Sequence, residues 1–149
     1  MGRRVAAHLR AAMQQRERKP VPDIETTSPS GPADAWPTEL RVVEGKHALA
    51  VTFEDGASFI LPAEYLRVES PSAEVQGHAP DEKITVPGKR RVRIAAVEPV
   101  GNYAVRLQFD DGHGTGIYTW PLLHALGSEQ EARFAAYLAE LERQDLSRG

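Results

Sequence analysis

Residues 101–126 read GNYAVRLQFDDGHGTGIYTWPLLHAL, and this stretch decides the fold of the chain. From Tyr103 to Phe109 every second residue is apolar, which predicts a strand with one apolar face. The short side chains and the glycine of residues 110–112 (DDG) favour a chain reversal. A second apolar run at 117–120 and the leucines after it predict another strand and a short helix. The stretch therefore predicts a strand, an acidic turn, a second strand and a helical turn.

A similar unit lies earlier in the chain. The sequence FEDG at 53–56 matches FDDG at 109–112, and residues 59–66 align with residues 116–123 after a one-residue insertion. Because so small a unit cannot bury its own apolar face, we predict that the two units pack against each other. The fold class that follows is α+β: a small β-rich domain of two related strand–turn–strand–helical-turn units, followed by a C-terminal helix.

The chain divides into three predicted regions. Residues 1–37 combine a basic tail with a linker that holds five prolines, and we expect them to be disordered. Their Arg-rich start is also typical of a mitochondrial presequence or a membrane-surface helix, but its apolar face is small. The folded domain is predicted at 38–127, with a first hairpin at 40–53 and a helical turn beginning at Pro62. Residues 128–149 are predicted to form a helix and a tail.

The C-terminal helix carries two signals. Ser128 and Glu131 form an S-x-x-E pattern, which predicts a capping box. Phe134, Leu138 and Leu141 then recur at helical spacing, which predicts one apolar face up to about residue 143. We expect this face to dock on the sheet or on a second copy of the chain.

Several classes of chemistry are excluded by residues that the sequence lacks. It has no cysteine, so it offers no thiol nucleophile, disulfide or cysteine-ligated metal. No histidine is followed two residues later by Asp or Glu, as facial-triad iron sites commonly require, and neither a G-x-S-x-G elbow nor a P-loop occurs. No apolar run approaches the roughly 18 residues of a membrane span. We therefore predict a cytoplasmic protein with no catalytic residue, no metal and no cofactor, which does not enter a membrane.

A basic cluster at residues 89–93 (KRRVR) raises the question of nucleic-acid binding. Its arginines alternate with apolar residues, as on the solvated face of an edge strand, and aromatic residues are not interleaved with them. Residues 20–149 carry 12 basic side chains against 20 acidic ones. We predict that the chain has no nucleic-acid partner.

His113 is the most chemically suggestive residue, because it lies in the acidic turn between two glycines. It could hydrogen-bond a local carbonyl or a carboxylate such as Asp111, or it could contact a ligand or partner; nothing in the spacing brings His78 near it. Tyr118 and Trp120 follow at a strand spacing of two, so they either present polar tips on one contact surface or belong to the core. The hypothetical binding residues are Arg67, His78, Asp111, His113, Tyr118 and Trp120. If they bind a partner, His113→Ala should weaken binding and change the melting temperature by only a few degrees.

Five strings of residues resemble a known family, the gamma-butyrobetaine-hydroxylase-like N-terminal domain, a domain of unknown function. They are LPAEYLR at 61–67, SPSAEV at 70–75, GH at 77–78, GNYA at 101–104 and FDDGH at 109–113. The resemblance covers roughly residues 40–126 and implies an α+β domain that is not itself an enzyme. In the hydroxylases such a domain precedes a catalytic dioxygenase domain, and a similar module is fused behind P-loop iron–sulfur carrier ATPases.

The resemblance also implies a position for a metal site that this chain does not keep. In the hydroxylase branch, a C-x-C-x-x-C cluster and a histidine in the later acidic turn bind structural zinc. The corresponding residues here are Ser70, Ser72 and Val75, and His113 matches the histidine. Because three of the four ligands are replaced, the resemblance does not carry the zinc over to this chain.

The function that we expect is a non-catalytic interaction or accessory module with a protein partner. The resemblance points to a P-loop iron–sulfur carrier ATPase as that partner and to a role in iron–sulfur cluster assembly. The alternative is a small-molecule or metal-binding domain that uses the turn around His113. An enzyme is disfavoured, because no nucleophile–base pair or metal triad can be assembled from the sequence.

Overall fold

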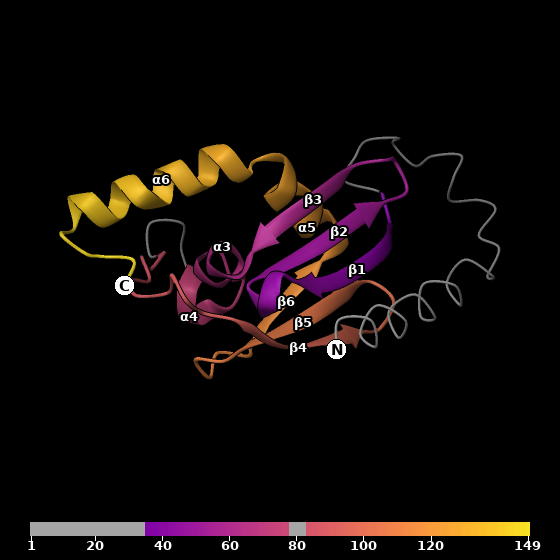
Figure 1. Cartoon of the computed structure of the whole chain (residues 1–149), viewed down its shortest axis with the longest axis horizontal. Coiled ribbons are helices and arrows are strands. Elements are labelled where there is room, and N and C mark those ends of the chain that lie inside the picture. The colour runs from indigo at the N-terminus through magenta and orange to yellow at the C-terminus, as the bar shows by residue number, and fades with distance from the viewer. Residues whose placement is uncertain (1–34, 78–82) are drawn as a thin grey trace.

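Six strands form two antiparallel sheets in the computed structural model, which describes residues 35–77 and 83–149. β1 (Pro37–Val43), β2 (Ala48–Phe53) and β3 (Ser58–Pro62) form the first sheet in that order. β4 (Ile94–Val100), β5 (Ala104–Phe109) and β6 (Gly116–Thr119) form the second. The two sheets lie together at the centre of the molecule (Figure 1).

Each sheet is followed by a helix. α3 (Ala63–Val68) follows β3, and α5 (Trp120–Ser128) follows β6, while the single-turn helices η2 (Glu44–Lys46) and α4 (Ala73–Gln76) lie in connections. α6 (Gln130–Arg143) extends away from the sheets along one side of the molecule (Figure 1). The described residues therefore form the α+β fold that the sequence predicts. Within the described ranges, no helix combines the length and the apolar character needed to cross a membrane.

The two predicted units have the same internal structure. β2 and β5 are the central strands of their sheets, and both bury their first, second, fourth and sixth residues. In both acidic turns the amide of a phenylalanine donates to a carbonyl four residues later, from Phe53 to Ala57 and from Phe109 to His113, each at 2.8 Å. The glycines of the two turns have φ angles of 91° and 94°, which glycine adopts without a steric penalty. The predicted relation between the units is thus confirmed, because they share the burial pattern of the central strand, the hydrogen bond that closes the turn and the φ angle of the turn glycine.

One core is shared by both units, as predicted. Alternate residues of the two central strands enter it, and side chains from α3, α5 and β6 complete it. The largest fully buried side chains are Tyr65, Tyr118, Phe53, Leu40, Leu49, Leu61, Leu66, Ile94, Leu107, Leu123 and Leu126. Tyr103 departs from the predicted pattern: it lies in the turn before β5 and is 54% exposed. The apolar face of β5 is therefore one alternate residue shorter than the sequence suggests.

The predicted capping box is wrong. α5 continues through Ser128, and α6 begins at Gln130 with Glu129 as its N-cap residue and no side-chain cap. The Ser128 hydroxyl instead lies 3.3 Å from His124 Nδ1, one turn earlier in α5. The predicted start of the helical turn in the first unit is also shifted by one residue, because Pro62 is the N-cap residue of α3 rather than its first helical residue.

The apolar face of α6 also differs from the prediction. Tyr137 and Leu141 are buried, whereas Leu138 is 38% exposed. The buried pair packs with Val68 of α3 and with Val86, and the Tyr137 hydroxyl donates to the Val86 carbonyl at 2.6 Å. α6 therefore docks on α3 and on the segment before β4 through these residues, while Phe134 packs against the main core. The predicted disorder of the tail falls almost wholly on residues outside the described ranges, and so does His78.

Candidate functional site

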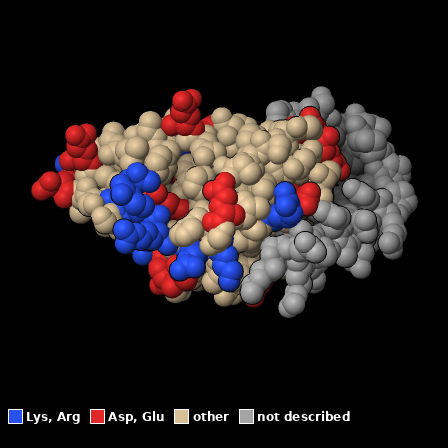
Figure 2. Space-filling model, viewed as in Figure 1, with Lys and Arg blue, Asp and Glu red and all other residues tan. Residues whose placement is uncertain are grey.

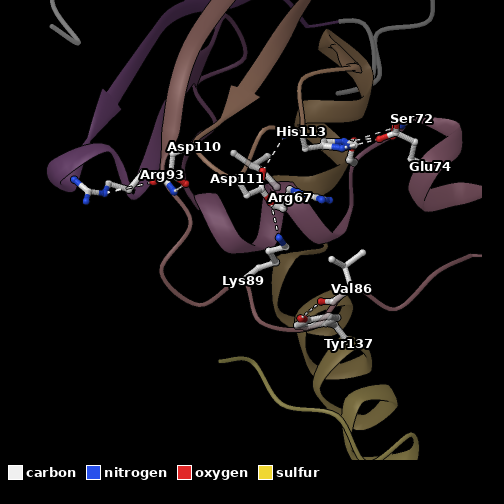
Figure 3. Close-up of polar contacts among 12 residues, drawn as sticks. Arg67, Ser72, Glu74, Val86, Lys89, Arg93, Asp110, Asp111, His113 and Tyr137 are labelled. Atoms are coloured by element: carbon white, nitrogen blue, oxygen red, sulfur yellow. Dashed lines mark hydrogen bonds and ion pairs between the residues drawn. The ribbon is translucent and has the colours of Figure 1, made fainter.

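Asp111 is the centre of a charged cluster, formed where the acidic turn after β5 meets α3. Its Oδ2 atom accepts a hydrogen bond from Arg67 Nε at 2.8 Å and lies 2.7 Å from Lys89 Nζ. Its Oδ1 atom accepts the backbone amide of His113 at 3.0 Å. The side chains of Arg67 and Asp111 are only 12% and 17% exposed. Figure 3 shows Arg67 and Lys89 directed toward Asp111 from different segments.

The pKa of Asp111 lies well below its ordinary value of 3.8. Burial alone would raise it, because the charged form is poorly solvated there. Hydrogen bonds from Lys89, from the His113 amide and from Arg67 outweigh burial and lower the pKa to about 2. The carboxylate is therefore ionised at neutral pH, and it neutralises two cations between the two units. Among the described residues, Arg67 Nη1 is a buried side-chain nitrogen without a hydrogen-bond partner.

His113 is buried and connects the acidic turn to the segment around α4. Its side chain is 3% exposed. The Nε2 atom lies 2.9 Å from Ser70 Oγ and 3.3 Å from Ser72 Oγ, and the Nδ1 atom lies 3.0 Å from Glu74 Oε1. Burial and the nearby Arg67 lower the pKa of His113, although Glu74 and Asp111 oppose them. The neutral ring then donates from Nδ1 to the Glu74 carboxylate and accepts at Nε2 from a serine hydroxyl.

This arrangement has the order of a serine–histidine–carboxylate relay, but it does not form a usable nucleophile. Ser70 is completely buried, and a catalytic hydroxyl must reach a substrate. His113 therefore ties the turn to the segment from Ser70 to Glu74. Of the two alternatives that the sequence leaves open for this residue, the structure shows a hydrogen bond from the ring to a carboxylate, which belongs to Glu74 rather than Asp111. The buried contacts also change the expected effect of removing His113, which now includes a loss of stability.

Tyr118 and Trp120 belong to the core. They are 0% and 5% exposed, and Trp120 begins α5, so the two do not share the face of one strand. The Tyr118 hydroxyl donates to the Leu66 carbonyl, and Trp120 Nε1 donates to the Asn102 carbonyl at 2.8 Å. Burial raises the pKa of Tyr118. The expectation that their polar tips line a contact surface is therefore wrong.

A second cross-unit contact is related to the Asp111–Arg67 pair and was not foreseen. His124 Nε2 lies 2.9 Å from Asp55 Oδ2. In the alignment of the two units, Asp55 corresponds to Asp111 and His124 corresponds to Arg67. In each unit, the aspartate of the acidic turn thus contacts the basic residue that follows the aligned leucine of the other unit. Asp111 contacts Arg67, and Asp55 contacts His124. The alignment contained this signal, because it places an acid and a basic residue at matching positions in both units.

The structure brings together three of the four positions that the resemblance aligns with the zinc ligands of the hydroxylase branch. The hydroxyls of Ser70 and Ser72 both lie within hydrogen-bond distance of His113 Nε2. Hydroxyl oxygens are poor substitutes for the thiolates that bind structural zinc. Across residues 35–77 and 83–149, no group of three or more His, Cys, Asp or Glu side chains is placed to hold a metal ion.

The surface beside this cluster carries both signs of charge. Lys, Arg, Asp and Glu side chains are interspersed on the face shown in Figure 2. The Arg93 side chain projects away from His113 (Figure 3) and is 55% exposed. Its Nε atom lies 3.8 Å from Asp110 Oδ2. Glu74 is 67% exposed. The buried polar core of the site is therefore bordered by a mixed, accessible rim.

Comparisons with known proteins agree on the family. A model of the gamma-butyrobetaine hydroxylase-like N-terminal family matches residues 40–124. Two similar solved structures are solution NMR structures. One has 42% identity, covers 76% of this chain and 90% of its own, and gives a TM-score of 0.66. The other has 43% identity, covers 82% of this chain and 90% of its own, and gives a TM-score of 0.68.

A third similar structure is a crystal structure of a protein of unknown function, which belongs to the DUF971 family and comes from Acidithiobacillus ferrooxidans. It is 40% identical, covers 67% of this chain and 100% of its own, and gives a TM-score of 0.54. Comparison with the curated proteins gives no match. Because the family model spans more than half of the chain and the solved structures share its fold, this chain belongs to the gamma-butyrobetaine hydroxylase-like N-terminal domain family.

Proposed function

We propose that this domain is a non-catalytic interaction module, which acts as an accessory to a protein partner. The observation that carries the proposal is that Asp111 and His113, the side chains best suited to acid–base chemistry, are engaged by other side chains of the same domain. Asp111 is bound by Arg67 and Lys89, and the ring of His113 is bound by serine hydroxyls and Glu74. Groups held in this way fix the shape of a surface and are not free to transfer protons to a substrate.

The contact surface that we propose is the rim of the acidic turn, defined here as Glu74, Arg93, Asp110 and Gly112. Glu74 and Arg93 are more than half exposed, and Asp110 is 45% exposed. No atom lies within 4 Å of where a Cβ would be at Gly112, so a partner can approach the backbone there. Arg67, Asp111 and His113 support this rim from beneath instead of contacting the partner themselves.

The partner class comes from the family resemblance. Modules of this kind are fused to P-loop iron–sulfur carrier ATPases, so we propose that the domain binds such a carrier in the cytoplasm and assists iron–sulfur cluster assembly. The rim suits such a protein contact, because it mixes both charges with open backbone at a glycine.

The test is capture of a purified P-loop iron–sulfur carrier ATPase by the immobilised full chain. Arg93→Glu reverses an exposed charge on the rim, and we expect it to weaken capture at least about tenfold, the effect of roughly 1.4 kcal/mol. The matched control is Arg106→Glu, which reverses a similarly exposed arginine that pairs with Glu98 on β4. Equal capture by the two variants, or no capture by the unmodified chain, would contradict the proposal.

One observation favours the alternative, a metal or small-molecule site at the turn around His113. Ser70 and Ser72 both approach its Nε2 atom, so the geometry of a binding site is present without its soft ligands. Elemental analysis and native mass spectrometry of the purified chain distinguish the two functions. A stoichiometric metal or metabolite that is lost in His113→Ala would support the alternative.

A further inference from the structure

A guanidinium group occupies a carboxylate pocket between α3 and α6. Arg148 donates from Nε to Glu64 Oε2 at 2.9 Å and from Nη2 to Glu64 Oε1 at 2.7 Å. The carbon at the centre of its guanidinium lies 5.4 Å from the ring centre of Phe134. A bidentate carboxylate and an aromatic face are the two features by which proteins recognise arginine in preference to lysine.

The carboxylate is built into the fold, whereas the arginine is not. Glu64 lies in α3 and its side chain is 6% exposed, while the Arg148 side chain is 33% exposed. A buried carboxylate without a cation is strongly unfavourable. Among the described residues, Arg148 is the cation within ion-pair distance of Glu64. The carboxylate therefore requires a cationic partner, but nothing in α3 requires that this cation come from residue 148.

The segment that carries Arg148 buries little of its surface. Residues 144–149 are largely exposed, and the carbonyls of Ser147 and Arg148 accept hydrogen bonds from the amides of Gly88 and Arg90, both at 2.9 Å. Segments with few buried apolar contacts open at low free-energy cost. In Figure 1 this segment turns back beneath α6 toward α4.

A groove continues from the pocket. It has a volume of about 670 Å³ and lies between α6 and the start of α3. Glu64, Tyr65, Phe134, Leu138 and Arg148 are among the residues that line it, and Leu138 is the exposed apolar residue on α6. Because Glu64, Phe134 and Arg148 all line this groove, a segment whose arginine replaced Arg148 would place its flanking residues along it.

We propose that this pocket, formed by Glu64, Tyr65 and Phe134, is a binding site for an arginine-bearing extended segment of another protein. Arg148 occupies it within the chain as an internal competitor. The incoming segment takes the same two contacts, a bidentate ion pair with Glu64 and a cation–π contact with Phe134, and its flanking residues lie in the groove beside Leu138. The pocket is separate from the acidic-turn rim, and the proposal does not depend on the identity of the partner there.

The test uses a fluorescent peptide that copies residues 145–149, blocked at both ends (acetyl-DLSRG-amide), and anisotropy with the full chain. Arg148→Ala removes the internal competitor, and we expect this variant to bind the peptide at least about tenfold more tightly than the unmodified chain. Arg148→Ala/Glu64→Gln should lose that binding. A peptide with lysine in place of arginine should bind about tenfold more weakly, since an ammonium cannot form the bidentate pair.

Arg143→Ala is the matched control, because it removes one positive charge from the end of α6, just before the segment that carries Arg148, without opening the pocket; Arg143 is 71% exposed and pairs with Glu140. If Arg148→Ala does not fold, NMR titration of the unmodified chain with the peptide should shift the signals of Glu64 and Phe134 and release the Arg148 side chain. A folded Arg148→Ala variant that ignores the peptide would overturn the proposal. So would a concentration-dependent dimer of the unmodified chain in which each pocket holds the second copy's tail. Failure here leaves carrier capture and the Arg93 comparison unaffected.

Discussion

The substitution Asp111→Asn should destabilise the domain, because it removes the charge that Arg67 and Lys89 both contact. The side chain keeps its shape and can still accept the amide of His113, so the change isolates electrostatics. Lowering the pKa of Asp111 from 3.8 to about 2 corresponds to roughly 2.5 kcal/mol of stability at neutral pH. The orphaned, largely buried Arg67 adds to this loss. At roughly 4 °C per kcal/mol for a domain of this size, the melting temperature should fall by about 10 °C.

The neighbouring substitution Asp110→Asn is the control. Asp110 is 45% exposed, its ion pair with Arg93 is 3.8 Å long, and the asparagine can still accept the Arg93 amide as the aspartate does. A solvated pair of this kind contributes up to about 1 kcal/mol, so Asp110→Asn should lower the melting temperature by no more than about 4 °C. Two adjacent acids in one turn should thus differ clearly under the same substitution.

The pH dependence gives an independent check with a defined sign. The folded state lowers the pKa of Asp111, so its stabilisation is complete above about pH 5 and is lost as the pH falls toward 2. The difference in unfolding free energy between the unmodified chain and Asp111→Asn should therefore shrink over that range. Urea unfolding at several pH values measures it. The reasoning would be refuted if Asp111→Asn lost no more unfolding free energy than Asp110→Asn. It would also be refuted if the loss for Asp111→Asn stayed constant down to pH 2.

Three further predictions follow from buried contacts. His113→Ala should cost about 1–3 kcal/mol by leaving buried hydroxyls without their partner, so thermal melting should fall by several degrees; an unchanged melting temperature would show that the imidazole contacts add nothing. The purified chain should contain no stoichiometric zinc and should not unfold with a chelator, whereas the triple variant Ser70→Cys/Ser72→Cys/Val75→Cys should bind one zinc by elemental analysis. Gly127→Ala should cost about 1–3 kcal/mol in urea unfolding, because its Cβ would lie 2.3 Å from the Phe59 ring.

The fold was readable from the sequence where local pattern and tertiary packing agree. The alternation through Phe109 predicts β5, and the repeat of the FEDG and FDDG turns predicts two related units that pack against each other, as the shared core shows. The errors lie where a local signal competes with packing. Ser128 resembles a helix cap, but α5 continues through it, and its hydroxyl meets His124 instead. Leu138 has the right spacing for the core, but Tyr137 takes the buried position because α3 lies on that side.

The candidate site was only partly readable, because its contacts join residues far apart in the chain. Arg67 and Asp111 were both selected, but their pairing spans 44 residues and no spacing rule predicts it. The sequence leaves open whether His113 makes a local hydrogen bond or contacts a partner, and the structure shows the ring buried against Ser70, Ser72 and Glu74. The sequence does not predict a role for Glu64 or Arg148, since a single glutamate in a helix and an arginine in a tail carry no local signal. Only the folded structure brings that carboxylate and guanidinium together.

The two units allow the requirements of the fold to be separated from those of the site. Both acidic turns close with the same backbone hydrogen bond, and the residue at the matching position is Ala57 in one unit and His113 in the other. Alanine is therefore sufficient for the turn, and the turn geometry does not require an imidazole. What His113 adds is the connection to Ser70, Ser72 and Glu74, a segment that follows α3 and has no counterpart after α5, where α6 begins at once. The imidazole thus holds the α4 segment beside the acidic turn. Because the fold does not require this connection, we expect the surface formed by the α4 segment and the acidic turn to serve the function of the domain.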